Sequence, residues 1–480
     1  MAFFQVDRSQ YPIGQGGFHS TVVHTSAKSR LSMVVDCGGS DAEHRGVLIN
    51  AFAGPPSQHD ILAISHFDDD HINGIEELHE AGVRFKSVFL PHVEAQHYLL
   101  WMTLRFSVEE TNSYELSRLV QLGGRLYGGD FGPVVLVGSP DPTTSDDQRR
   151  GDAADENLAA HLTKDAYDAV MKARGVGGQI FPCAQSLTFK NIDWLVRFYS
   201  REWKFPAEVQ TIWSLPLFAS LKAIVDRTAK PMSSADWASF ATDLETQLSA
   251  KIKPGDAAQV RKILGAKPSK ADPRLKAVQK LVRDIQSKPN GLSCKNVLSQ
   301  LYLLSDSLKD YNDASMCIYS GPAQRSVGTR RERFSRLIHF GRRALSEHKL
   351  KDAPSREVGW ITTGDADFST PTKLKDFLTH FHCEMGLTTV FVLPHHGSRM
   401  SYDPNMDRLR ELIAHLCDRP LFIAPANPEH KKYHHPHWQV ESTCRRFGDF
   451  YVVDQGFASS YAESLRVVRN LTGLMILDSE

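Results

Sequence analysis

The sequence has no run of about 20 apolar residues, so we expect no transmembrane helix and no membrane partner. Its first residues, Met1 to Asp7, lack the basic and apolar segments of a secretory signal. It has no Cys-x-x-Cys pair, and its seven cysteines are scattered, which predicts reduced thiols and a cytoplasmic location. The net charge is zero, so any attraction to nucleic acid must come from local patches.

At 480 residues the chain is long enough for two hydrophobic cores or one elaborated core. Strand-like patterns occupy residues 1–140 and return at 309–480. The predicted strands include Val134–Val137 and Asp449–Val453, and a helix is predicted over Trp438–Phe447. Between them, residues 141–308 show helix-like segments separated by proline and glycine. We therefore predict an α/β (α+β) domain in two halves, 1–140 and 309–480, and a mostly helical insertion at 141–308 that is a candidate docking site for a protein partner.

The most informative stretch follows an apolar run at residues 61–64 that predicts a buried strand. Two imidazoles and two carboxylates come within the next seven residues: His66, Asp68, Asp70 and His71. Carboxylates this close raise one another's pKa, and a bound cation removes the conflict. Four ligands from one loop cannot all face one ion, so the stretch predicts a site with two metals. The alternative is a solvated acidic turn that happens to be flanked by histidines.

Other predicted strands also end in residues that bind metals. The residues that follow them are Asp36 after 31–35, Asp365 after 358–363, His395 and His396 after 388–393, and a histidine-rich loop at 433–437 after 420–424. Ligands gathered at one edge of a sheet form one site, so we expect these residues to meet. Asp36 has two readings: it is an ordinary turn aspartate, or it orients a ligating histidine.

A basic segment at 321–355 precedes the strand that ends at Asp365. Phe334 and Phe340 are interleaved with its arginines, a composition suited to phosphate contact and base stacking. The alternative is a solvated charged surface. The candidate nucleic-acid contacts are Arg330, Arg331, Arg333, Arg336, Arg342 and Arg343.

Taken in order, the motifs resemble those of the metallo-β-lactamase fold, whose hallmark is HxHxDH. The similarity is greatest to the branch that contains the hydrolase-like domain of bacterial DNA-internalisation competence proteins. It rests on Gly14-Gln15-Gly16-Gly17, Asp36-Cys37-Gly38, His66–His71, Asn312–Ser315, Thr363-Gly364-Asp365, His395-His396-Gly397-Ser398 and His434-His435-Pro436-His437. The resemblance covers the chain except for 141–308 and 321–355.

The resemblance implies an αββα sandwich with two divalent metal ions at one edge. It assigns Asp70, His71 and His396 to one metal, and His66, Asp68 and either Asn312 or Asp313 to the other, with Asp365 as the bridge. It also implies that Asp36 orients a ligand, that Asp70 is required for catalysis, and that His395 and His435 face the substrate, where they stabilise an anionic oxygen or protonate a leaving group.

The chain departs from the family pattern at three positions. Asp68 replaces the second histidine of HxHxDH, Gly17 replaces the acid of the opening motif, and His434 replaces the glycine of the late motif. A carboxylate at position 68 gives one site a harder ligand, an oxygen in place of an imidazole nitrogen. Harder ligands favour manganese or iron, although zinc still binds tightly. We therefore expect two zinc or manganese ions. The alternative is a decayed site that retains only the fold.

Two metals would activate a water between them, and such a centre can hydrolyse phosphodiesters, phosphoesters, thioesters or lactones. The branch and the arginine-rich segment favour a phosphodiesterase or nuclease that acts on nucleic acid. Two alternatives stay open. One is a small-molecule metallohydrolase acting on a nucleotide or phosphoester, with the insertion as a lid. The other is a sensor or scaffold without catalytic activity, in which the metals are structural.

Overall fold

The computed structural model of the chain describes residues 2–25, 30–54, 58–91, 93, 122, 125–126, 129–137, 180–181, 186–189, 194–201, 211, 214–226, 239, 242–243, 246–247, 249–251, 253–264, 293–294, 297, 314–322, 328–336, 347–349, 357–430 and 433–469. The chain divides into two compact units. The first comprises Met1–His92, Phe131–Glu202 and Asn312–Glu480, and the second comprises Val93–Asp130 and Trp203–Tyr311.

The described elements of the second unit include two α-helices, α9 (Ala219–Asp226) and α11 (Pro254–Leu264). Both fall inside the segment 141–308 that was predicted to be mostly helical. The unit boundaries differ from that prediction, because part of 141–308 belongs to the first unit and residues 93–130 belong to the second.

Three strands of the first unit lie inside the predicted insertion: β7 (Ile180–Phe181), β8 (Ser186–Phe189) and β9 (Trp194–Tyr199). Every residue of β9 is buried, including Arg197, whose guanidinium Nη1 lies 2.8 Å from Glu384 Oε1. An arginine inside an apolar run is typical of a surface segment, and its partner lies far along the chain, so the sequence pattern hid this strand.

The first sheet has ten strands in the order β12-β11-β17-β1-β2-β3-β4-β5-β6-β7. Its strands run antiparallel from β12 to β3 and parallel from β3 to β7. Their bounds are β12 (Glu347–Lys349), β11 (Gly328–Arg336), β17 (Tyr461–Arg469), β1 (Ala2–Gln10), β2 (Gly16–Thr25), β3 (Arg30–Gly39), β4 (Gln58–Ala63), β5 (Arg84–Leu90) and β6 (Val134–Val137).

The second sheet has seven strands in the order β16-β15-β14-β13-β10-β9-β8. The strands β13 (Gly359–Thr362), β14 (Thr388–Val392), β15 (Leu421–Pro425) and β16 (Asp449–Val453) run parallel, and β10 (Cys317–Pro322), β9 and β8 are antiparallel to their neighbours. The carboxyl ends of β13, β14 and β15 therefore share one edge, as do those of β3 and β4 in the first sheet. The predicted mixture of helices and strands is confirmed.

The two sheets share one hydrophobic core. The rings of Phe89 in β5 and Phe198 in β9 stack across it, with centroids 4.7 Å apart and planes at 9°. Arg8 of β1 also crosses the core: its guanidinium pairs with Glu463 at 2.9 Å and donates at 2.7 Å to the backbone oxygens of Ser320 and Val358. Contacts of this kind fix how the edges of the two sheets face each other.

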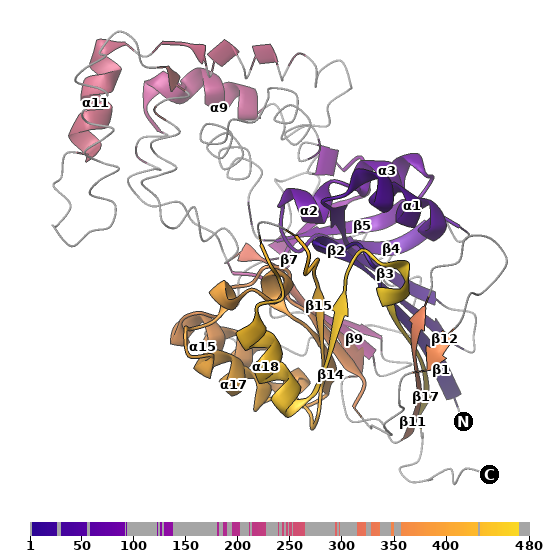
Figure 1. Cartoon of the computed structure of the whole chain (residues 1–480). Helices are drawn as coiled ribbons and strands as arrows, with labels where there is room; N and C mark the ends of the chain where they lie inside the picture. The colour runs from indigo at the N-terminus through magenta and orange to yellow at the C-terminus, as the bar shows by residue number, and fades with distance from the viewer. Residues whose placement is uncertain are drawn as a thin grey trace, which may run out of the picture. The chain divides into compact units, whose positions relative to one another are not determined.

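Helices cover both sheets. α1 (Ala42–Phe52) and α3 (Ile75–Glu80) contact β3, and α15 (Pro371–His380), α17 (Asp407–Ile413) and α18 (Trp438–Phe447) bury apolar side chains against the second sheet (Figure 1). The other short helical segments are α2 (Asp69–Ile72), α16 (His382–Met385), η2 (Pro216–Phe218), η5 (Pro394–Gly397), η6 (Arg399–Ser401) and η7 (Phe457–Ser459). Within the described ranges, no helix has both the length and the apolar character needed to cross a membrane.

Candidate metal centre

The centre begins where β4 ends. Ser65 follows the strand, and the loop 66–71 leads into the short helix α2. His66 and His71 are buried in this loop, whereas the side chains of Asp68 and Asp70 are each 27% exposed. Asp68 stands at the N-cap of α2, but its side chain makes no capping hydrogen bond. The four ligand candidates thus divide into two buried imidazoles and two carboxylates that reach solvent.

Three imidazoles are held at Nδ1, so that Nε2 faces the centre. His71 Nδ1 lies 2.9 Å from Asp36 Oδ2, and His396 Nδ1 lies 2.8 Å from the Pro425 carbonyl oxygen. Because these partners only accept hydrogen bonds, Nδ1 carries the proton and Nε2 of the neutral ring keeps its lone pair. His66 Nδ1 lies 2.9 Å from the Ser65 hydroxyl. This arrangement is typical of histidines that bind metals through Nε2.

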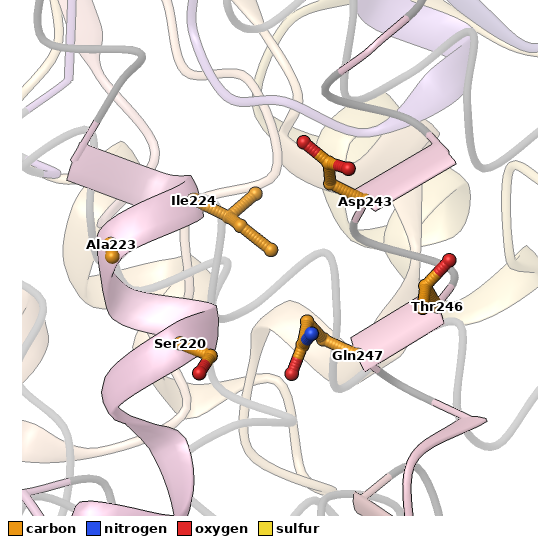
Figure 2. A pocket seen from close by; sticks show the side chains of 6 residues that line it. All are labelled: Ser220, Ala223, Ile224, Asp243, Thr246 and Gln247. Carbon is orange, nitrogen blue, oxygen red and sulfur yellow. The ribbon is translucent and has the colours of Figure 1, made fainter.

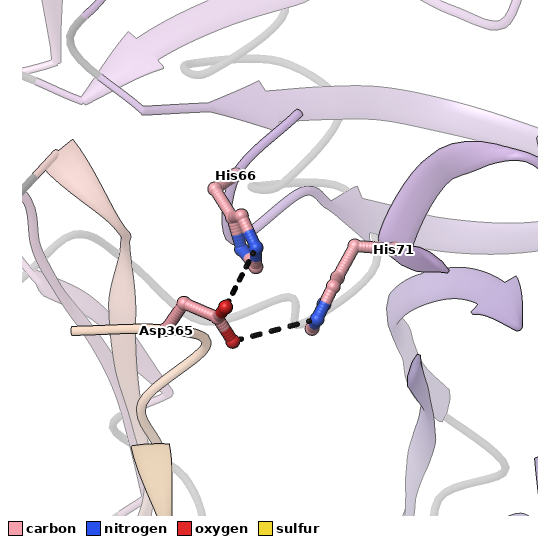
Figure 3. A group of neighbouring side chains, drawn as sticks. All are labelled: His66, His71 and Asp365. Carbon is pink, nitrogen blue, oxygen red and sulfur yellow. Dashed lines mark ion pairs between the residues drawn. The ribbon is translucent and has the colours of Figure 1, made fainter. Parts of the chain in front are cut away.

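Asp365, after β13, lies between the imidazoles (Figure 3). Its Oδ2 is 3.6 Å from His66 Nε2 and 3.7 Å from His395 Nε2, whereas its Oδ1 is 3.6 Å from His71 Nε2 and 3.9 Å from His396 Nε2. The carboxylate therefore turns one oxygen toward each side of the centre. His396 Nε2 also lies 3.2 Å from Asp70 Oδ2.

The site fits a cation. Nε2 of His66, Nε2 of His71 and Oδ1 of Asp365 are buried and have no hydrogen-bond partner, a costly arrangement unless something else binds them. The distances of 3.6 Å from His66 Nε2 to Asp365 Oδ2 and from His71 Nε2 to Asp365 Oδ1 are too long for hydrogen bonds. Two ligands of one tetrahedral zinc, with bonds of about 2.1 Å, would lie roughly 3.4 Å apart. Among the described residues, two groups have ligand atoms close enough for one ion: His66, His71 and Asp365, and Asp70, His71 and His396.

The charges in the centre also favour a cation. Burial lowers the pKa of His71, but the Asp70 and Asp36 carboxylates more than offset this and raise it to about 10. The pKa of His396 is likewise raised, against burial, by Asp70 and Asp365. The pKa values of Asp70 and Asp365 fall despite burial, because histidines surround both carboxylates. Without a metal the centre therefore holds protons that a metal must displace.

The backbone at the centre is strained. Asp36, His395 and His396 have φ values of 55°, 48° and 58°, in the left-handed region that non-glycine residues rarely adopt. Strain of this kind persists where the surrounding structure imposes it, and it is concentrated at functional sites. Gly17 approaches the same place, because a Cβ there would lie 2.7 Å from His71 Nδ1. The strained turns thus hold the two histidines of η5 and the carboxylate behind His71.

The two histidines expected to face substrate lie beside the centre. The His395 side chain is 32% exposed, and its ring centroid lies 5.7 Å from that of His435. Burial, with His396 and His395 nearby, lowers the pKa of His435 to about 4. His435 is therefore neutral at pH 7, so it can offer a hydrogen bond or a ring face there but no positive charge.

The structure brings nine predicted residues together: Asp36, His66, Asp68, Asp70, His71, Asp365, His395, His396 and His435. Asp68 belongs to neither of the two ligand groups, although its Oδ2 lies 3.8 Å from His66 Nε2. Asn312 and Asp313 lie outside the described residues.

Strand β11, which carries four of the predicted arginine contacts, lies on a different part of the fold from the loop 66–71. Arg330, Arg331, Arg333 and Arg336 fall on β11, of which only the backbone is described, and Arg342 and Arg343 fall outside the described residues. Four strands, β17, β1, β2 and β3, separate β11 from β4. At roughly 4.8 Å per strand, β11 lies roughly 24 Å from β4 across the sheet. Strand β13, which leads to Asp365, belongs to the other sheet, so closeness in sequence is not closeness in the fold.

Two groups that the structure places at the centre were not predicted from the sequence. The Ser65 hydroxyl donates to Asp36 Oδ2 at 2.6 Å, and its backbone N–H donates to Asp36 Oδ1 at 2.7 Å. The second group is the carbonyl of Pro425, at the end of β15, which holds His396. A serine at a strand end is a weak signal for the first, and no side-chain pattern could reveal a backbone carbonyl.

A cavity of about 410 Å³ lies in the second unit beside α9 (Figure 2). Its lining is Ser220, Ala223, Ile224, Asp243, Thr246 and Gln247. One carboxylate and no imidazole face it, so it offers no ligand set comparable to that of the metal centre.

No protein-family model matches the chain, and a search of curated proteins finds no match either.

Proposed function

We propose that this chain is a metal-dependent hydrolase that cleaves phosphodiester bonds in nucleic acid, and that its two sheets and flanking helices form an αββα sandwich of the metallo-β-lactamase type. The observation that carries the proposal is the set of buried atoms without hydrogen-bond partners, Nε2 of His66 and His71 and Oδ1 of Asp365. These atoms converge, and the opposite side of each imidazole is already engaged.

The ligand set supports two cations. Since Nδ1 of His71 is engaged by Asp36, its Nε2 can bind only one ion, with Asp70, His396 and Oδ1 of Asp365. His66 would then bind a second ion with other ligands. The carboxylate oxygens nearest to its Nε2 are Oδ2 of Asp365 at 3.6 Å and Oδ2 of Asp68 at 3.8 Å. Asp365 would bridge the two ions through its two oxygens.

When bound, the cations would neutralise charge that develops on a phosphoryl oxygen and generate a nucleophile from water near neutral pH. The residues of the chain supply the rest. Asp36 holds His71 in one tautomer, and Ser65 holds Asp36. His395, partly exposed beside Asp365, is placed to donate a hydrogen bond or a proton to a substrate oxygen.

A cleavage assay with matched variants tests the proposal. The purified protein should contain a divalent metal and cleave nucleic acid; a chelator should abolish cleavage, and added manganese or zinc should restore it. Asp365→Asn should lose metal and cleavage together, because it removes the negative charge of the one carboxylate shared by both sites and replaces one of its oxygens by an amide nitrogen. Asp418→Asn, at an exposed aspartate away from the centre, is the control and should behave as the parent. Full cleavage by Asp365→Asn, or no cleavage by the metal-loaded parent, would reject the proposal.

A further inference from the structure

Three of the four large apolar side chains that are exposed in the described part of the chain lie in or beside the two loops that carry histidines of the metal centre. They are Met400, 72% exposed, Trp438, 69%, and Tyr433, 43%, whereas the fourth, Phe447, 40% exposed, lies at the far end of α18. Met400 follows the turn that carries His395 and His396, and Tyr433 and Trp438 flank the loop that carries His435. Exposed apolar groups that cluster beside a reactive centre mark a binding surface rather than random exposure.

The two loops form one surface. The His437 N–H donates to the Gly397 carbonyl at 3.0 Å, and a Cβ on Gly397 would lie 2.8 Å from the Cβ of Pro436. The turn of Met400 is held as well, because its N–H donates to the Ser398 hydroxyl at 3.2 Å. The aromatic groups are therefore fixed relative to the histidines of the centre.

A run of nearly parallel rings leads from this surface toward the metal centre. Tyr433 and His435 have centroids 6.0 Å apart with planes at 17°, and His435 and His396 have centroids 6.4 Å apart with planes at 26°. His430 also stacks on Tyr433, with centroids 4.9 Å apart and planes at 22°, so the aromatic surface open to a flat ring of a ligand is that of Trp438, 69% exposed, and the exposed part of Tyr433. Arg399 is exposed in the same turn as Met400, and no described carboxylate pairs with its guanidinium, so a cation is available for a phosphate.

We infer that Met400, Tyr433 and Trp438, here called the aromatic rim, bind an unpaired base of single-stranded nucleic acid while Arg399 contacts a neighbouring phosphate. This rests on the proposed function and names its substrate form. Stacking on the rim requires the face of a base, which a duplex hides between neighbouring pairs. A strand also offers several bases and phosphates to a surface built from two loops, whereas a free nucleotide offers one base.

Binding measurements on a cleavage-blocked protein test the rim apart from catalysis. The full-length Asp365→Asn protein is titrated into a fluorescent single-stranded oligothymidylate and into an abasic strand of the same length, and binding is followed by anisotropy. Trp438→Ala and Tyr433→Ala, each added to Asp365→Asn, should weaken binding of the base-containing strand about 5- to 150-fold. Trp438→Phe should restore most of the affinity. The abasic strand should bind weakly to the parent and to both variants alike.

Phe447→Ala is the matched control, since Phe447 is exposed at the other end of the same helix, α18, roughly 13 Å from Trp438 along the axis. It should leave the affinity unchanged. Equal affinity for the two strands, equal loss in Phe447→Ala, or tighter binding of a mononucleotide or duplex would overturn the inference. If the rim variants lose binding as expected but the metal-loaded parent cleaves nothing, the proposed function fails and the rim stands.

Discussion

Asp36→Asn is the sharpest perturbation of the candidate metal centre, because it changes one atom behind His71 and little else. Asparagine tolerates the left-handed φ of 55° better than most residues, so the backbone should hold. Its side-chain oxygen can still accept the Ser65 N–H, which bonds to Asp36 at 2.7 Å in the parent. The new amide group then points at His71 Nδ1 and donates to it, where the carboxylate accepted.

Exchanging an acceptor for a donor at residue 36 selects the wrong tautomer of His71. A neutral His71 that accepts at Nδ1 carries its proton on Nε2, the atom required by the metal. Loss of a partner behind a ligating histidine typically weakens metal binding about 10- to 100-fold, or about 1.4 to 2.7 kcal/mol. We expect Asp36→Asn to show a loss of this size at pH 9.

The loss should shrink as the pH falls. In the parent, the pKa of His71 is raised to about 10, so a metal must displace its proton at any lower pH, and each unit weakens binding about tenfold. Asp36 is one of the carboxylates that raise this pKa, so the variant holds the proton less tightly and loses less affinity on acidification. The ratio of the two dissociation constants should therefore be largest at pH 9 and approach one near pH 6.

Competition with a metal-sensitive dye measures both constants across this range. Asp60→Asn is the control, because Asp60 is also a buried aspartate of the first sheet but pairs with Lys86 at 2.7 Å, away from the centre. It should lower folding stability without changing metal affinity. Equal affinities of Asp36→Asn and the parent at pH 9, or an equal loss in Asp60→Asn, would refute the tautomer argument.

Two further predictions follow from close packing and from burial. Gly17→Ala should weaken metal binding at least tenfold, because its Cβ would lie 2.7 Å from His71 Nδ1, whereas Gly46→Ala, with open space around its Cβ, should leave affinity unchanged and stabilise α1 by about 0.5–1 kcal/mol. Equal metal affinities in the two variants would contradict this. Arg8→Met should cost about 3–5 kcal/mol in denaturant unfolding, because it leaves Glu463 charged and buried, and adding Glu463→Leu should recover most of the loss. A double variant no more stable than the single one would show that the guanidinium matters through its bonds to the other sheet.

The sequence predicts best where the fold is local. The predicted bounds of β6, β16 and α18 are confirmed residue for residue, because short apolar runs and one amphipathic helix specify them without distant partners. The loop 66–71 was identified for the same reason, since its ligand types are adjacent in the chain. Helix α1 was not predicted: its apolar positions do not form a stripe, and it begins with an Asp41 side chain that accepts from the His44 N–H.

Features that depend on strand order could not be predicted from spacing. The arginine-rich segment precedes the strand of Asp365 in the chain, yet the chain passes from β11 in one sheet to β13 in the other. The aromatic rim shows the opposite case, because Met400 and Trp438 are far apart in sequence and share a surface only through contacts between their loops. The rim thus adds a second candidate contact for nucleic acid, and the arginine contacts stay a prediction.

The same dependence on strand order applies to the metal centre itself. The loop after β4 supplies His66, Asp70 and His71 from one sheet, whereas Asp365 and His396 come from the other. Neither sheet holds a full set, so the centre exists only when the shared core is packed, and the unfolded chain offers no comparable site. A cation that binds only the packed state stabilises it, by an amount that grows as the cation concentration rises above the dissociation constant. Metal binding is thus coupled to the packing of the two sheets. This is why a motif of six residues can suggest the centre but cannot by itself specify it.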